Sequence, residues 1–371
     1  MEFRSFNILF FREFPYEGST NSELLNAINS KGQTELKSSD NPEFDHLIRT
    51  LLTVDTKERL SWDQYFMHPF LVKGDCWKFY TDIKKIGEAE YYDVYKAKLN
   101  DSEEFRAIKV IDLKTIKSEL EKHKLRKITP KDLKPYLDDF IKETENMELL
   151  RGKDKGNKNT VIFYQYFQTE DQFCIVQELC DGSLNALCKE KKRFTVKEIY
   201  QILNQLNNSF RILQEKNLSH KDLRLKKILI KINEKGENIY KLTGLEFNRQ
   251  VEKLLGRGGR MINYQYKAPE ILAGEISHKE ISKEELNLKY QKADLWSLGV
   301  IIYKLYFGEF PYEGKTAREI SNSIMKSDNS KLNEISDNDL KDLVKKLLTD
   351  EINDRIDWKG YFNHKFFSGR R

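Results

Sequence analysis

The segment that decides the fold is SHKDLRLKKIL, residues 219–229. A run with apolar residues at helical spacing, KEIYQILNQLNNSFRILQ (197–214), comes directly before it. We therefore expect Asp222 to lie in a loop that follows a long helix.

Three more segments surround it in a fixed order. AIKV (107–110) places Lys109 in a run of β-branched residues that is typical of a strand. YKAPEIL (266–272) and DLWSLGV (294–300) follow on the other side. The order and spacing of four segments is far more specific than any single short motif.

The chain changes character near residue 183. Before it, short runs rich in Tyr, Phe, Ile and Val predict strands, and a charged stretch at about 113–150 predicts a helix. After it, helical periodicity dominates. A small sheet followed by a larger helical part predicts an α+β protein with a ligand cleft between its halves. The predicted strands are 79–87, 92–99, 105–113, 160–167 and 173–179.

This plan and the four segments resemble the eukaryotic protein kinase family over roughly residues 78–368. The resemblance implies a bilobal fold, with a β-rich N-lobe at about 78–178 and a helical C-lobe at about 179–368. It also implies an enzyme that transfers the γ-phosphate of ATP to a protein. Two phrases, ELCDGSL (178–184) and YFNHKFF (361–367), are similar to the calmodulin-dependent and autophagy-initiating branches.

Phosphoryl transfer requires bound phosphates, metal charge and a carboxylate that aims the acceptor hydroxyl. The resemblance assigns the phosphate-holding lysine to Lys109 and the catalytic carboxylate to Asp222. Arg224 stands where Ser/Thr kinases place a lysine, which favours a Ser/Thr lineage. The partner of Lys109 is Glu143, with Glu145 as the second candidate; the alternative is a solvated glutamate on a charged helix. The resemblance adds to the ATP-binding residues Gly87, Val94, Ala107, Glu178 and Cys180.

The glycine-rich loop departs from the family pattern. In GEAEYYDV (87–94), Ala89 and Tyr92 replace the second and third glycines. Those glycines let the backbone approach the phosphates without an intervening Cβ, whereas a tyrosine ring crowds them. We therefore expect at most weak binding of ATP.

The two metal-ligand positions depart more strongly. Lys227 stands where the family has an asparagine, and Gly244 stands where it has the metal-binding aspartate. Lysine cannot ligate a hard cation at neutral pH, and glycine has no side-chain oxygen. Glu246 would supply a ligand only if the register slipped by two residues. We expect no metal ligands and no bound magnesium ion.

Several structural positions of the family are retained. The resemblance pairs Glu270 with Arg355 in the interior, keeps His220 before the catalytic carboxylate, and gives Asp294 the role of bracing that loop. The segment 244–267 contains no serine or threonine, so it offers no such residue for an activating phosphate. Lys221 replaces the arginine that helps to bind that phosphate.

The chain also contains a long-range repeat. FREFPYEG (11–18) returns as FGEFPYEG (307–314), and the offset between Phe14 and Phe310 is 310 − 14 = 296. At this offset residues 10–71 match 306–367 without a gap, with 22 identities in 62 positions. Such a period is too long for a solenoid repeat.

We therefore divide the chain into a partial C-lobe tail (1–72, a repeat of about 297–368) and a kinase-like domain (73–371). Arg59 matches Arg355 but has no Ala-Pro-Glu segment before it. We expect the tail to be a partly ordered helical appendage without a catalytic role.

Composition limits the partners. The 371 residues are 39% hydrophobic and 33% charged, as in soluble globular proteins. A net charge of +5, from 64 Lys and Arg against 59 Asp and Glu, is nearly balanced and argues against nucleic-acid or membrane partners. The four cysteines form no Cys-x-x-Cys pair, and the N-terminus lacks a signal-peptide pattern. We expect a cytoplasmic protein whose partner or substrate is another protein.

Three interpretations remain open. The first is a pseudokinase that acts through binding. The second is an active Ser/Thr kinase in which Arg224 and Lys227 supply the positive charge that metal ions normally bring. The third is a decayed tandem gene of which 1–72 is a remnant. The first and third are compatible, and we favour the first for the complete copy.

Overall fold

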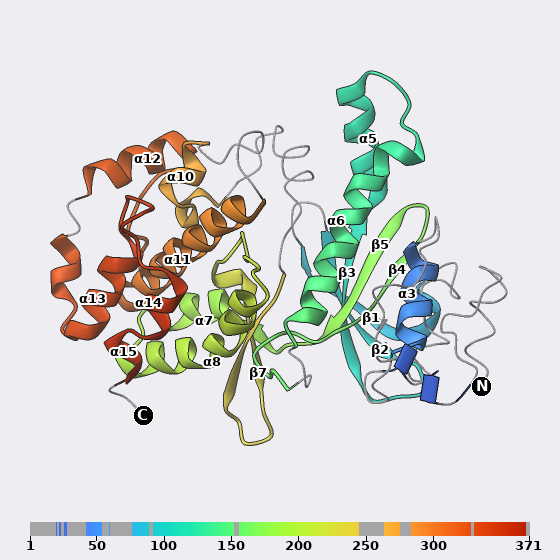
Figure 1. Cartoon of the computed structure of the whole chain (residues 1–371), viewed down its shortest axis with the longest axis horizontal. Coiled ribbons are helices and arrows are strands. Elements are labelled where there is room, and N and C mark those ends of the chain that lie inside the picture. The colour runs from blue at the N-terminus through green and yellow to red at the C-terminus, as the bar shows by residue number, and fades with distance from the viewer. Residues whose placement is uncertain are drawn as a thin grey trace.

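The computed structural model of the chain describes residues 20, 22–23, 26–27, 42–53, 59, 76–88, 92–151, 156–244, 263–274, 283–327 and 330–368 (Figure 1). In the first half of the chain its helices and strands are α3 (Pro42–Leu51), β1 (Tyr80–Glu88), β2 (Tyr92–Leu99), β3 (Phe105–Asp112), α5 (Leu113–Lys124), α6 (Pro130–Leu149), β4 (Phe163–Gln168), β5 (Gln172–Glu178), β6 (Gly182–Ser183) and α7 (Leu184–Lys191).

The second half is richer in helix. It contains α8 (Val196–Glu215), β7 (Ile228–Ile232), β8 (Asn238–Leu242), α10 (Pro269–Leu272), α11 (Lys283–Phe307), α12 (Ala317–Lys326), α13 (Asn338–Leu347), α14 (Trp358–Phe362) and α15 (Lys365–Ser368). Short 3₁₀ helices are η1 (Cys76–Phe79), η2 (Leu225–Lys227), η4 (Tyr264–Tyr266) and η5 (Ser330–Glu334).

The N-lobe is a five-stranded antiparallel sheet in the order β1-β2-β3-β5-β4. The inner strands β3 and β5 are buried on both faces, which explains their nearly continuous β-branched and aromatic character. One face carries a cluster that includes Ile111 and Phe173 and joins Phe140 of α6. The opposite face carries Ile108 and Phe167. Helix α6 therefore packs on the sheet from one side.

The charged stretch predicted as one helix forms two. Helix α5 ends at Lys124, and its C-cap residue Leu125 has φ +51° and is 91% exposed to solvent. Helix α6 begins at Pro130, and its N-cap residue Thr129 forms a capping box with Asp132. A left-handed residue followed by such a cap ends one helix and starts another. The sequence TP at 129–130 is the local signal for this break.

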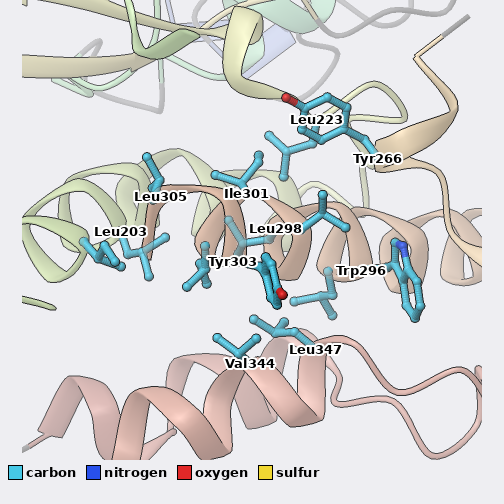
Figure 2. Close-up of a cluster of buried hydrophobic side chains, with 14 of the residues drawn as sticks. Leu203, Leu223, Tyr266, Trp296, Leu298, Ile301, Tyr303, Leu305, Val344 and Leu347 are labelled. Carbon is cyan, nitrogen blue, oxygen red and sulfur yellow. The ribbon is translucent and has the colours of Figure 1, made fainter. Parts of the chain in front are cut away.

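The C-lobe is built around α11, whose residues from Leu295 to Leu305 lie almost entirely in the interior. Figure 2 shows its side chains between those of α8 and α13, with Leu203 on one side and Leu347 on the other. At Gly299 an added Cβ would lie 2.9 Å from Leu347 Cβ and 2.9 Å from Leu348 Cδ2. The close contact between α11 and α13 therefore requires glycine at this position.

A sheet lobe joined to a larger helical lobe confirms the predicted bilobal α+β fold. No helix in the described ranges is both long enough and apolar enough to span a lipid bilayer.

A buried ion pair ties α10 to the last part of the C-lobe. Arg355 is 1% exposed, and it donates from Nη1 to Glu270 Oε1 (2.7 Å) and from Nη2 to Glu270 Oε2 (3.0 Å). It also donates from Nε to the carbonyl oxygen of Thr349 at 2.9 Å. This bidentate geometry with further hydrogen bonds is what an interior charge pair requires.

The described part of the N-terminal segment has the same local structure as the C-lobe at the offset of 296. Helix α3 (Pro42–Leu51) and helix α13 (Asn338–Leu347) correspond residue for residue at both ends. The buried positions of α3 are Phe44, Leu47, Ile48 and Leu51, and the buried positions of α13 are Leu340, Leu343, Val344 and Leu347. Each of the four in α3 lies 296 residues before its counterpart.

Two side-chain hydrogen bonds recur as well. Thr53 Oγ1 donates to the carbonyl of Arg49, as Thr349 Oγ1 does to that of Lys345. Arg59 Nε donates to the carbonyl of Thr53 at 2.9 Å, the same bond that Arg355 makes to Thr349. Arg59 is exposed, whereas Arg355 is buried on Glu270.

Helix α3 lies beside the sheet lobe, where the ring of His46 meets the edge of Tyr166 in β4 at 6.4 Å (Figure 1). The division into a C-lobe tail and a complete domain stays a prediction, because most of residues 1–72 lie outside the described ones.

The two equivalent arginines give a matched pair of variants. We expect Arg355→Met to lower the free energy of unfolding by about 3–5 kcal/mol, because it leaves Glu270 as an unpaired interior charge. Arg59→Met should change it by less than about 0.5 kcal/mol, because this side chain is exposed. Urea unfolding followed by circular dichroism measures both, and equal effects would contradict the difference in burial.

Removal of residues 1–72 tests the appendage. We expect the remaining chain, 73–371, to stay soluble and to unfold cooperatively with a midpoint close to that of the full chain, because its two lobes contain their own cores. Differential scanning calorimetry of both proteins makes the comparison. A loss of several kcal/mol, or an insoluble product, would show that the segment is an integral part of the fold.

Candidate functional site

Lys109 lies in the middle of β3, where the register places it opposite Val94 of β2. Its Nζ lies 3.0 Å from Oε1 and 3.3 Å from Oε2 of Glu143 on α6. Both side chains are buried, with Lys109 6% exposed. Of the two candidate glutamates it is therefore Glu143 that meets the lysine, while Glu145 pairs with Lys142 at the surface.

Tyr92 contacts the same ammonium group from β2. Its ring centroid lies 4.2 Å from Lys109 Nζ, within cation–π range. The ring also packs against the cluster between the sheet and α6. Gly87 lies opposite Val94 in the β1–β2 pair, and Ala89 lies outside the described residues. A phosphate that approached Lys109 would have to compete with both the carboxylate of Glu143 and the ring of Tyr92.

The loop that carries Asp222 is fixed to the core by Asp294. This carboxylate accepts hydrogen bonds from the backbone N–H groups of His220 (2.6 Å) and Lys221 (2.8 Å). Burial raises the pKa of Asp294 to about 7, and the two backbone donors oppose that rise. The ring of His220 lies 3.2 Å from the carbonyl of Thr243, which joins the loop to the strand end before Gly244.

Asp222 is surrounded by cationic groups. Its Oδ2 accepts a hydrogen bond from Arg224 Nε at 2.9 Å and lies 3.7 Å from Lys227 Nζ. The carboxylate is therefore paired by side chains of its own loop and of η2. Lys227 is only 4% exposed, so its ammonium group belongs to the interior of the site.

Gly244 and Lys227 are neighbours in space. The β7–β8 pairing places Ile228 opposite Leu242, and the N–H of Thr243 donates to the carbonyl of Lys227 at 3.0 Å. A Cβ added at Gly244 would lie 2.8 Å from Lys227 Nζ and 3.3 Å from its Cδ. Gly244 also has φ +65°, which glycine adopts without strain.

These residues do not fit a divalent metal ion. The two positions from which the family offers oxygen ligands hold an ammonium group and a bare Cα, and the ammonium lies at the Asp222 carboxylate. Among the described residues no cluster of three or more His, Cys, Asp or Glu side chains could hold a metal. Glu246, which would supply a ligand only in a register shifted by two residues, lies outside the described residues together with the rest of the segment 245–262.

The remaining residues assigned to ATP binding, Ala107, Glu178 and Cys180, lie near the end of β5. Glu178 closes β5, where it pairs with Arg106 of β3, one residue before Ala107. Its side chain accepts from Lys241 Nζ at 3.0 Å, so this carboxylate is occupied within the protein. Burial raises the pKa of Cys180 to about 12, and the charge of Glu178 adds to that rise.

Two features of the site were not predicted from the sequence. One is the buried pair of Lys241 with Glu178, for which the only signal is a lysine in the apolar strand before Gly244. The other is the direction of the Tyr92 ring toward Lys109 rather than toward solvent. The sequence signal for this direction is that Tyr92 lies two residues before Val94, so both side chains are on the same face of the strand.

Comparison with known proteins gives a family match. The model described as "Protein kinase domain" matches residues 80–367, which is most of the chain. The match covers both lobes and every side chain of the candidate site.

Individual relatives agree. The chain is 27% identical over 297 residues to calcium-dependent protein kinase 5 of Plasmodium falciparum (isolate 3D7), covering 77% of this chain and 44% of that protein. It is 26% identical over 290 residues to serine/threonine-protein kinase atg1 of Dictyostelium discoideum, covering 77% of this chain and 38% of that protein. It is 28% identical over 225 residues to serine/threonine-protein kinase 33 of Bos taurus, covering 58% of this chain and 44% of that protein. The chain thus spans less than half the length of these curated relatives.

Tyr92 offers a direct test of the geometry around Lys109. We expect Tyr92→Gly to tighten the binding of ATP in EDTA roughly two- to thirtyfold, because a cation–π contact of about 0.5–2 kcal/mol no longer competes for the ammonium. Isothermal titration calorimetry measures the change. The control is Tyr95→Gly on the same strand, whose ring faces Trp77 instead. If both variants bind ATP as the native protein does, the ring does not obstruct the site.

Proposed function

The chain belongs to the protein kinase family, and from that membership we propose that it is a pseudokinase of Ser/Thr lineage. In this proposal the kinase fold presents a binding surface to a protein partner, and phosphotransfer is weak or absent. The relatives of this chain are serine/threonine kinases, which supports the lineage.

One observation carries the proposal. Lys227 Nζ lies 3.7 Å from the carboxylate of Asp222 and 2.8 Å from where a side chain at Gly244 would begin. The space in which the family's two metal ligands would act is thus filled by a cation of the protein itself. Without oxygen ligands nothing in the described site bridges a metal to the phosphates, and that bridge supplies much of the charge stabilisation in phosphoryl transfer.

Nucleotide binding, if the pseudokinase retains it, is metal-independent and weak. The cationic groups Lys109, Arg224 and Lys227 remain, but each already has a carboxylate partner. The ring of Tyr92 covers one of them. ATP would therefore displace existing contacts before it gained new ones.

The competing candidate is an active Ser/Thr kinase of unusual chemistry. Its support is the retained Lys109–Glu143 pair together with Asp222 braced by Asp294. In that case Arg224 and Lys227 would stabilise the charge on the transferred phosphoryl group. The pairing of both cations with Asp222 opposes this, because a carboxylate held by two cations is a poor acceptor for a hydroxyl proton.

We also propose that residues 1–72 derive from the C-lobe of a second kinase copy. The matching ends of α3 and α13 and the shared arginine hydrogen bond support this. Such a remnant is compatible with a pseudokinase role for the complete copy. The nearly balanced charge supports a protein partner rather than a nucleic acid, in a cytoplasmic setting.

Phosphotransfer decides between the two candidates. With Mg²⁺ and labelled ATP we expect incorporation into a pool of Ser/Thr peptides at the background rate, because loss of even one such electrostatic element costs about 10²–10³ in rate. The native protein and Asp222→Asn should then be indistinguishable. Robust incorporation that Asp222→Asn abolishes would establish the active-kinase alternative instead.

A further inference from the structure

Within the described ranges, two stretches of backbone join the sheet lobe to the helical lobe. One is the chain itself, which leaves β5 at Glu178 and enters the helical lobe. The other is the segment 157–161 before β4, which forms a parallel bridge with β8. There the N–H of Val161 donates to the carbonyl of Leu242 at 2.9 Å, and the N–H of Leu242 donates to the carbonyl of Asn159 at 2.8 Å.

Glu178 is the point at which these stretches meet. Its N–H donates to the carbonyl of Ile162 at 2.8 Å, and its carboxylate Oε2 accepts from the N–H of Ile162 at 3.2 Å. The same oxygen lies 3.0 Å from Lys241 Nζ of β8. One carboxylate therefore holds together the end of β5, the segment before β4 and a strand of the helical lobe.

Lys241 is buried at this junction. It is 5% exposed, and its Nζ also lies 3.5 Å from the carbonyl of Thr160. A buried ammonium group is costly unless it is paired, so a movement of the end of β5 away from β8 would leave this charge unpaired in the interior. That cost opposes any bending of the hinge that separates Glu178 from Lys241.

A buried amide side chain supports the same junction. Asn159 is 5% exposed, and its Nδ2 donates to the carbonyl of Tyr240 on β8 at 2.9 Å and to Gln205 Oε1 on α8 at 3.1 Å. Ser209 of α8 donates from Oγ to the carbonyl of Asn159 at 2.7 Å. The segment before β4 is thus bonded to two elements of the helical lobe, and it moves with the sheet lobe only if these hydrogen bonds break.

From this geometry we infer that the Lys241–Glu178 pair is a hinge lock, which holds the two lobes at one fixed angle. Enzymes that close a cleft around their substrate need a hinge that bends in each turnover. A locked hinge instead makes the two lobes one preorganised surface, and this lowers the entropic cost of binding a partner that contacts both. The benefit for partner binding rests on the pseudokinase function proposed above, whereas the lock is independent of it.

Hydrogen–deuterium exchange of the full chain, followed by mass spectrometry, tests the junction. For Lys241→Met we expect the backbone amides in 159–162 and 240–243 to exchange at least about tenfold faster than in the native chain. The reason is that loss of one partner leaves the carboxylate of Glu178 unpaired at the junction. The control is Lys235→Met at the exposed turn between β7 and β8, which should exchange as the native chain does.

The angle between the lobes is measured by double electron–electron resonance. Spin labels are placed at Glu103, before β3, and at Asn353, between α13 and α14, because both positions are exposed. Coupling the labels to p-acetylphenylalanine leaves the four native cysteines unmodified. The native chain should give one narrow distribution of distances, which Lys241→Met broadens and Lys235→Met leaves unchanged.

The double variant Lys241→Met with Glu178→Met removes the pair without leaving an unpaired charge, so it carries the test if the single variant does not fold. It should also broaden the distribution of distances, because two methionines make no directional contact. Three results would overturn the lock: a broad distribution in the native chain, a double variant with the native distribution, or a folded Lys241→Met that exchanges as the native chain does. None of these measurements involves ATP or phosphotransfer, so failure of the lock and failure of the pseudokinase proposal are distinguishable.

Discussion

The carboxylate of Asp294 holds the candidate site to the core of the C-lobe. It projects from α11, whose residues from Leu295 to Leu305 lie almost entirely in the interior, and accepts hydrogen bonds from the backbone N–H groups of His220 and Lys221. Because these hydrogen bonds fix the main chain, the loop keeps its shape whatever side chains follow. Asp222, Arg224 and Lys227 take their places from that shape. The brace therefore explains how a site can lose its metal ligands and still be well ordered.

Interior residues and site residues are under different physical constraints. Glu270 and Arg355 form a buried pair, and loss of either partner leaves a charge in the interior. The side chain of Lys227 occupies the space beside Gly244, where an added Cβ would lie 2.8 Å from Nζ. Its ammonium group lies 3.7 Å from the carboxylate of Asp222. Stability thus constrains the scaffold more strictly than it constrains the chemistry of the cleft residues.

The sequence predicted the two lobes and the five strands of the sheet well, because alternating apolar residues and the order of four motifs are strong signals. It also placed Lys109 on a strand, Glu143 on a helix and Asp222 in a loop after a long helix, as they lie in the structure. It did not predict the break before Pro130, because a single residue with φ > 0 decides it. It could not give the direction of the Tyr92 ring or the contact of Lys227 with Gly244, because these depend on packing between segments that are distant in the chain.

The surface of α11 at Gly299 packs against α13. Helix α3 has apolar residues at the same positions as α13, so one polypeptide contains two helices with the pattern that this surface binds. The length of the connecting chain favours α13. The connection from α11 to α13 runs from 307 to 338, or 31 residues, whereas that from α3 to α11 runs from 51 to 283, or 232 residues. Closing the longer loop costs about 1.8 kcal/mol more in chain entropy, roughly a twentyfold preference for the nearer helix. Synthesis acts in the opposite direction, because α3 leaves the ribosome long before α13 does. Chain entropy therefore favours α13 against α11, whereas the order of synthesis favours α3.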